Sequence, residues 1–191
     1  MPNWCTTDYV FEGDKKDLQA LYDTLQRIEK KQELSRTSSF GNLWLGNLIT
    51  ELGGKWEDFY CRGYIYCPQL YDDHLLFSTE TAWTPMNETM DYVCEKLTSL
   101  TYYYQSEEGG CDLYWTNDSA GKYFCRYMVR LCNDGYDECE FFGTQEEAFE
   151  YISKNFNTAV KSIADVENLN ERLEEKENDD YCYLNEFVNP D

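Results

Sequence analysis

The sequence has few positive charges and a single histidine. Its 191 residues include 37 acidic side chains but only 16 lysines and arginines, so the formal net charge is −21. Affinity for nucleic acids comes mainly from lysine and arginine side chains that neutralise phosphates. Direct nucleic-acid binding is therefore not expected, and the charge favours a basic protein as the partner.

The sequence also lacks any hydrophobic run near the ~18 residues that a membrane-spanning helix needs. Its first residues, MPNWCTTDYV, have neither the basic flank nor the apolar core of a signal peptide. We therefore expect a cytoplasmic protein without membrane contact. The nine cysteines include no C-x-x-C pair, so the commonest zinc and iron–sulfur spacings are missing. The sequence predicts reduced and buried thiols, with no metal and no cofactor.

Aromatic residues are abundant, at 17% of the chain, and supply apolar area for a folded core. Alternating apolar residues predict strands, and apolar residues three and four positions apart predict helices. Pro68 is expected to end the second strand, and Thr84 with Pro85 to begin a helix. Thr144 and Glu147 have the spacing of a helix capping box. The expected strands are 4–11, 59–67, 75–82, 99–105, 111–116, 123–131 and 138–142. Three helices are expected to begin at Asp14, Thr84 and Thr144, a short one to include Leu43 and Leu52, and a last one to include Val160 and Leu173.

This order of elements predicts an α+β fold. Strand, helix, short helix, strand, strand, helix, strand is the plan of a ferredoxin-like split βαβ sandwich, here with an antiparallel sheet extension and added C-terminal helices. The predicted organisation is a ferredoxin-like domain over 1–143, a C-terminal helical extension over 144–178 packed on it, and an acidic tail over 179–191. The narrow apolar stripe of the last helix predicts that it lies across the surface or pairs with another chain. The tail is expected to fray.

The stretch YYYQSEEGGCDLYW, 102–115, predicts a hairpin, with a glycine adopting the positive φ of the turn. Two acidic stretches, 106–120, which includes the turn of this hairpin, and 133–151, contain no lysine or arginine. These stretches form either a solubilising surface or a surface that attracts a basic partner. The candidate partner-binding residues are Glu107, Glu108, Asp112, Asp134, Asp137, Glu138 and Glu140.

Four short motifs carry a family resemblance: MPNWC at the start, GGKWED at 53–58, TAWTP at 81–85 and YYYQSEEGG at 102–110. With them the chain resembles the ferredoxin-like domain of plasmid- and phage-encoded YubB-like proteins over residues 1–131. The resemblance implies an intracellular protein of a mobile genetic element whose biochemical role is unassigned, with no catalytic residues to transfer. It marks Trp4, Trp56 and Trp83, which either pack in the core or line an aromatic pocket.

Two functions remain open from the sequence. The first is a non-catalytic acidic interaction protein that binds a basic protein, such as one that handles nucleic acid. The alternative is a small metal-dependent hydrolase that uses carboxylates of the sheet, because paired acids perform general acid–base catalysis or hold a metal ion. For that alternative the candidate acids are Glu80 and either Glu107 or Glu108.

Overall fold

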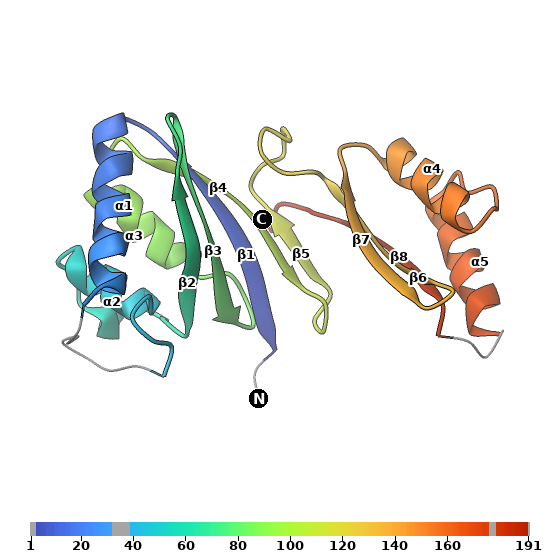
Figure 1. The fold of residues 1–191 in the computed structure, drawn as a ribbon, viewed down its shortest axis with the longest axis horizontal. Coiled ribbons are helices and arrows are strands. Elements are labelled where there is room, and N and C mark those ends of the chain that lie inside the picture. The colour runs from blue at the N-terminus through green and yellow to red at the C-terminus, as the bar shows by residue number, and fades with distance from the viewer. Residues whose placement is uncertain (1–2, 32–38, 176–178, 191) are drawn as a thin grey trace. The chain divides into compact units, whose positions relative to one another are not determined.

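The computed structural model describes residues 3–31, 39–175 and 179–190 (Figure 1). The chain divides into two compact units, an N-terminal unit, Met1–Asn117, and a C-terminal unit, Asp118–Asp191. Each unit combines an antiparallel sheet with helices, which confirms the α+β fold. The N-terminal unit contains β1 (Trp4–Glu12), α1 (Lys15–Glu29), α2 (Leu45–Glu51), η1 (Trp56–Asp58), β2 (Gly63–Leu70), β3 (His74–Ala82), α3 (Asn87–Lys96), β4 (Thr101–Glu108) and β5 (Leu113–Thr116). The C-terminal unit contains β6 (Tyr127–Asn133), β7 (Tyr136–Phe142), α4 (Gln145–Asn155), α5 (Ile163–Glu174) and β8 (Tyr181–Glu186).

The sheet of the N-terminal unit has the strand order β2-β3-β1-β4-β5. Strand β1 pairs antiparallel with both β3 and β4, so the helical connections from β1 to β2 and from β3 to β4 each pass over one intervening strand. This is the predicted split βαβ arrangement, and β5 is the added antiparallel strand. Among the residues that the structure describes, no helix has the length and apolar composition needed to cross a bilayer.

Helices α1, α2 and α3 lie on one face of this sheet (Figure 1). Strand β1 alternates its side chains between that face and the other, as a pleated strand requires. Tyr9 and Phe11 point toward the helices and are fully buried, together with Phe77 of β3 and Leu21 of α1. Asp8, which precedes Tyr9 in β1, points to the opposite side and is exposed. The main hydrophobic core therefore occupies one face of the sheet, whereas the other face carries polar side chains such as Asp8 together with the buried Val10.

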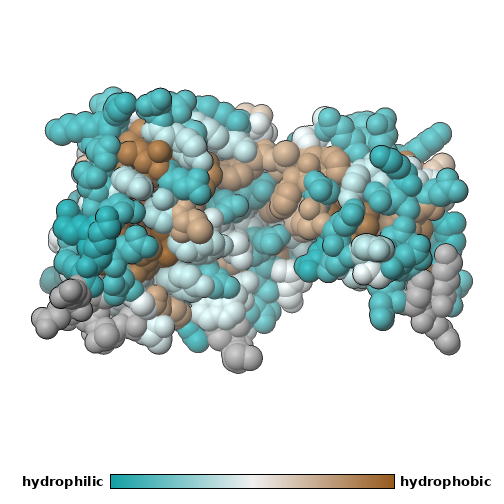
Figure 2. Space-filling model, in the orientation of Figure 1, coloured by the Kyte–Doolittle hydropathy of each residue, from teal (hydrophilic) through white to brown (hydrophobic). Residues whose placement is uncertain are grey.

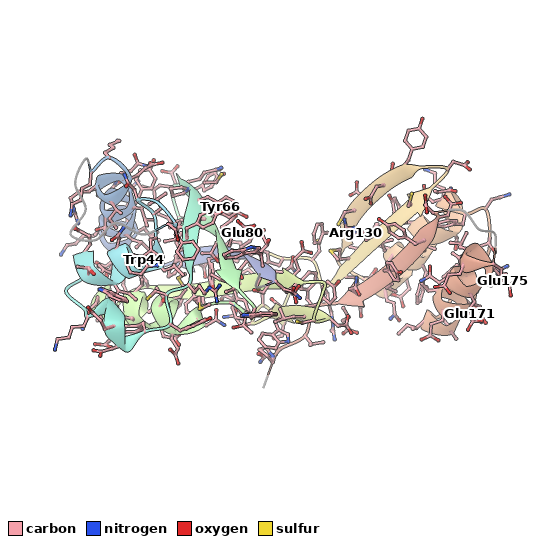
Figure 3. All side chains as sticks on the ribbon, turned by 90° about the horizontal axis from the view of Figure 1, so that it is seen from below. Trp44, Tyr66, Glu80, Arg130, Glu171 and Glu175 are labelled. Carbon is pink, nitrogen blue, oxygen red and sulfur yellow. The ribbon has the colours of Figure 1, made fainter. Side chains whose placement is uncertain are left out.

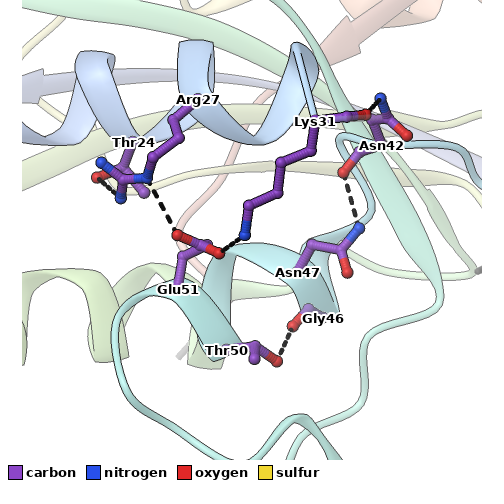
Figure 4. A network of polar contacts seen from close by, with 8 residues as sticks. All are labelled: Thr24, Arg27, Lys31, Asn42, Gly46, Asn47, Thr50 and Glu51. Atoms are coloured by element: carbon purple, nitrogen blue, oxygen red, sulfur yellow. Dashed lines mark hydrogen bonds and ion pairs between the residues drawn. The ribbon is translucent and has the colours of Figure 1, made fainter. Parts of the chain in front are cut away.

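A polar contact joins α1 to α2 on the helical side (Figure 4). The Glu51 carboxylate accepts a hydrogen bond from Arg27 Nε at 3.1 Å and another from Lys31 Nζ. The Lys31 hydrogen bond is the main cause that lowers the pKa of Glu51 below its ordinary value. The contact fixes the end of α2 against the end of α1.

Two predictions made from prolines are not met by the structure. Pro68 does not end β2, which continues to Leu70 through an irregularity in its pairing between Tyr66 and Gln69. Strand β2 lies at the edge of the sheet, where a residue without an N–H is tolerated, especially at a bulge. Pro85 does not begin a helix either, because α3 starts at Asn87.

The C-terminal unit has a sheet with the order β7-β6-β8 and its own core. Helices α4 and α5 pack on one side, α4 against β6 and β7 and α5 against β8. The capping box of α4 is confirmed, since Thr144 Oγ1 accepts from the Glu147 N–H and Glu147 Oε2 accepts from the Thr144 N–H. The buried side chains of this unit include Val129, Leu131, Ala148, Ile152, Val166, Leu169, Leu173 and Cys182.

The observed division of the chain differs from the expected one. It falls after Asn117 rather than after residue 143, because β6 pairs with β7 and β8 in a separate sheet instead of extending the first. The segment expected to fray contains β8, in which Cys182 is fully buried. Helix α5 is likewise an integral part of this core, with Leu169 and Leu173 buried. The expectation of a surface helix followed by an acidic tail is therefore wrong, although residues 176–178 and 191 lie outside the described residues.

Candidate functional site

The segment 102–115 forms the predicted hairpin between β4 and β5. Its residue with positive φ is Asp112, at 54°, and not one of the two glycines. Glu107 is exposed, whereas Glu108 is 6% exposed and accepts a hydrogen bond from the Gly110 N–H at 2.9 Å. A hydrogen bond with Cys111 is the main cause that lowers the pKa of Glu108. The Glu108 side chain therefore forms hydrogen bonds within the turn.

The second acidic set lies on and beside β7 of the C-terminal unit. Asp134 and Gly135 form the two-residue turn between β6 and β7, with φ values of 52° and 80°. An Asp-Gly pair is a strong signal for this kind of turn, and it marks the hairpin in the sequence. The Asp134 N–H donates to Asp180 Oδ1 at 2.9 Å. The Asp134 side chain therefore lies at the tip of a hairpin.

The acids of β7 point to both sides of their sheet. Glu138 and Glu140 lie opposite the buried residues Leu131 and Val129, on the helical side, where the Tyr151 hydroxyl donates to Glu138 at 2.7 Å. Asp137 points to the other side and accepts from the Tyr181 hydroxyl at 2.8 Å. These residues thus share the edge of the sheet rather than one face. Every residue of β7 is exposed except Phe142, which is half-buried.

A row of polar side chains crosses the sheet of the N-terminal unit on the face opposite its helices, which we call the outer face. Thr6 in β1 is paired with Glu80 of β3 on one side and with Glu107 of β4 on the other. Tyr64 of β2 lies beyond Glu80, and Tyr114 of β5 lies beyond Glu107. Of the acids that the sequence named for a hydrolase, Glu80 and Glu107 are therefore on one face, with Cα atoms roughly 10 Å apart across two strand spacings, whereas Glu108 alternates to the other side of β4.

A third carboxylate, Asp8, lies in the next row of the outer face. It is paired with Ser78 of β3 and accepts a hydrogen bond from the Ser78 hydroxyl. Glu80 accepts a hydrogen bond from the Tyr64 hydroxyl in the same way. That hydrogen bond is the main cause that raises the pKa of Tyr64 to about 12. Hydroxyl donors from neighbouring strands thus orient both carboxylates.

Aromatic rings line the β2 side of the outer face. The ring centroids of Trp4 and Phe40 are 6.0 Å apart, those of Phe40 and Tyr64 are 6.5 Å apart, and those of Tyr64 and Tyr66 are 6.0 Å apart. Tyr66 and Glu80 are labelled in Figure 3, where both lie on this part of the sheet. The result is a continuous set of rings beside two oriented carboxylates.

The three tryptophans marked by the family resemblance do not converge. Trp4 belongs to the outer face, whereas Trp56 is half-buried and packs against Trp44 in the core, with ring centroids 5.2 Å apart. Trp83 follows β3, is 43% exposed and donates its backbone N–H to the Asn3 carbonyl. The structure therefore does not assemble a pocket from these three side chains.

The other side chains that could act in catalysis or bind a metal lie apart from one another. His74 lies 2.7 Å from Asp73 through its Nδ1 and stacks on Tyr71. Within the described part of the chain, no three His, Cys, Asp or Glu side chains are placed to hold a metal ion. Four cysteines are buried as expected, but Cys67, Cys111 and Cys139 are exposed. A shallow pocket of about 300 Å³ on the helical side is lined by Asp58, Phe59, Glu88, Asp91, Tyr92 and Glu95.

Comparisons with protein-family models, with curated proteins and with solved structures give no match to this chain. Fold and geometry therefore define the protein as a two-unit α+β chain with an acidic edge strand and an acidic, aromatic sheet face. Sequence reasoning missed Asp8, Tyr64 and Tyr66. The alternation of side chains in a strand predicts that Tyr64 and Tyr66 point to the same side of one strand. The sequence does not show which strands pair, or in which register, so it does not place Asp8 beside these tyrosines.

Proposed function

We propose that this chain is a non-catalytic interaction protein that binds a basic protein partner, and that β7 provides a binding surface. The observation that carries this proposal is the exposure of β7 along an edge of its sheet, with Asp137 on one side and Glu138 and Glu140 on the other. An edge strand presents unpaired backbone groups to an incoming extended segment. Acids on both sides of such a segment favour one that carries positive charge.

The polar surface of the C-terminal unit and the composition of the stretch around β7 support this role. Hydrophilic residues cover much of the face of the C-terminal unit that is visible in Figure 2. No lysine or arginine occurs between Asn133 and Tyr151. A basic protein would therefore be attracted over a distance of about one Debye length, roughly 10 Å at 0.1 M salt. The resemblance to YubB-like proteins extends the proposal to a mobile genetic element in a bacterial cytoplasm, with a nucleic-acid-handling protein as the partner.

The test compares capture by three proteins. The wild-type chain, a β7 variant and a control variant are immobilised and exposed to host lysate at about 0.1 M and about 0.5 M salt, a change that shortens the Debye length. The β7 variant combines Asp134→Asn, Asp137→Asn, Glu138→Gln and Glu140→Gln. The control variant removes the same number of negative charges from exposed glutamates on α5 and directly after it. These control positions are Glu167, Glu171, Glu174 and Glu175.

We expect mass spectrometry to identify a basic protein that the wild type and the control retain at low salt and that the β7 variant loses. Release at high salt would follow from the electrostatic part of the attraction. Equal loss from both variants would mean that total charge alone is responsible. Equal retention by all three would remove β7 from the proposal.

One observation favours the alternative, a metal-dependent hydrolase. Glu80 and Glu107 lie in one row of the outer face, on either side of Thr6. The corresponding test is calorimetry with Mg²⁺, Mn²⁺ and Ca²⁺. Saturable binding of one ion that disappears in both Glu80→Gln and Glu107→Gln would support this alternative. Weak binding without saturation would refute it.

A further inference from the structure

The outer face of the N-terminal unit carries negative charge that its own strands do not neutralise. None of the five strands contains a lysine or an arginine. Four of their carboxylates, those of Asp8, Glu12, Glu80 and Glu107, lie on the outer face by strand alternation. Asp8 and Glu107 are exposed, and Glu80 is half-buried. The composition of the strands therefore favours a ligand that supplies positive charge.

Two of these carboxylates are held in place before any ligand binds. One oxygen of Glu80 accepts from the Tyr64 hydroxyl, and one oxygen of Asp8 accepts from the Ser78 hydroxyl. Neither donor carries a charge, so neither hydrogen bond is an ion pair. Each also keeps a second oxygen that can accept from an external donor. Preorganisation of this kind lowers the entropic cost of binding.

The neighbouring rings add a second kind of contact. Tyr64 and Tyr66 are half-buried, and Trp4 is 39% exposed. A guanidinium group stacks on aromatic rings and donates two parallel hydrogen bonds to a carboxylate, whereas an ammonium group has no planar face for stacking. Carboxylates beside accessible rings therefore favour arginine over lysine.

The spacing of the two oriented carboxylates suits an extended chain. Asp8 lies one row away from the row of Glu80, on the adjacent strand. Such diagonal neighbours are about 7–8 Å apart. Side chains on one side of an extended segment repeat about every 6.8 Å, or two residues. Two arginines at alternate positions can therefore each reach one of these carboxylates.

We propose that the outer face, at Asp8, Glu80, Tyr64 and Tyr66, binds an extended segment of a partner protein that carries arginine at alternate positions. This inference rests on the proposed function, because it names the chemistry of the basic partner and a second surface that receives it. It assigns the outer face a ligand class that fits both its charge and its rings.

The test measures binding of a short synthetic peptide with arginine at every second position, by fluorescence anisotropy at about 0.1 M salt. Three proteins are compared. The outer-face variant is Asp8→Asn with Glu80→Gln, which keeps the shapes of both side chains. The control is Glu171→Gln with Glu175→Gln, which changes the net charge by the same amount at exposed positions on α5 and directly after it (Figure 3).

We expect the outer-face variant to bind the peptide at least about tenfold more weakly than wild type, because two charge-assisted contacts are lost. The control should change by less than about threefold, as expected for distant, screened charges. A matched lysine peptide should bind wild type more weakly than the arginine peptide does. Addition of the arginine peptide should shift the NMR signal of the Trp4 indole N–H.

The experiment distinguishes a failure of this inference from a failure of the proposed function. If the arginine peptide binds wild type and both variants equally, or if both variants weaken equally, the outer face is not the site, and the proposed function at β7 stands untouched. If neither basic peptide binds any of the three proteins, the inference and the proposed binding of basic segments both fail. Equal binding of the lysine and arginine peptides would overturn the assignment of arginine.

Discussion

Tyr64 and Glu80 lie directly opposite each other on β2 and β3, and the Tyr64 hydroxyl donates a hydrogen bond to the Glu80 carboxylate. The two residues are 16 positions apart in the sequence, and the β2–β3 hairpin brings them together. The contact orients the acid that the outer face offers to a ligand. It also links a tyrosine ring and a carboxylate into one polar unit on the sheet.

The Glu80→Gln variant tests this contact through the titration of Tyr64. The hydrogen bond that the protonated Tyr64 hydroxyl donates to Glu80, aided by partial burial and by the charge of Glu80, raises the pKa of Tyr64 from 10.0 to about 12. We expect the pKa of Tyr64 to fall toward 10 in Glu80→Gln, as followed by NMR of tyrosine labelled at Cζ. The raised value also means that the Tyr64 contribution to stability is complete below about pH 10 and is lost as the pH rises toward 12. An unchanged Tyr64 titration in the variant would contradict the contact.

The Glu51→Gln variant should weaken the junction of α1 and α2. Glu51 loses its charge but keeps its shape, so the pairs with Arg27 and Lys31 lose their Coulombic part. We expect a loss of about 0.5–1 kcal/mol in the free energy of unfolding at neutral pH, the upper range for surface ion pairs. Because the pKa of Glu51 is lowered, wild type should lose this advantage as the pH falls below 4.5 and through that lowered value. A difference between the two proteins that persisted at the lowest pH would argue against an ionic origin.

Replacement of Thr144 by alanine removes half of the capping box of α4. The N–H of Glu147 then loses its acceptor at the start of the helix. We expect a destabilisation of about 1 kcal/mol, typical for the loss of an N-cap side chain. Hydrogen exchange of the α4 amides is the appropriate measurement, because a chain with two cores need not unfold in one step. Replacement by serine, which keeps the hydroxyl, should leave the exchange nearly unchanged.

Deletion of residues 180–191 tests whether the end of the chain is structural. The deletion removes β8, the antiparallel partner of β6, and with it the buried Cys182. We expect the amides of β6 to lose protection from exchange and the unit containing α4 and α5 to become markedly less stable. Deletion of residues 188–191 alone keeps β8 and serves as the control. If the longer deletion had no greater effect than the shorter one, the pairing of β8 with β6 would contribute little.

The local elements follow from the order of residues alone. The spacing of Leu18, Leu21 and Leu25 predicts α1, since residues three and four apart share a helix face. Thr144 and Glu147 predict the start of α4 because both partners of the capping box lie within one turn. The aromatic alternation around Gly109 and Gly110 predicts the β4–β5 hairpin, although the positive φ falls on Asp112 instead.

The pairing of distant strands emerges only in the folded chain. The sequence could not place β6 in a second sheet, nor β8 beside it, because strand partners are selected by packing between segments far apart in the chain. The same is true of the outer face. Thr6 lies between Glu80 and Glu107 only through the register of three strands, and a slip of one residue in β3 or β4 would turn the carboxylate of that strand toward the core. The negative charge, the α+β class and most local elements can be read from the order of residues, whereas the register of the strands sets which acids share a surface.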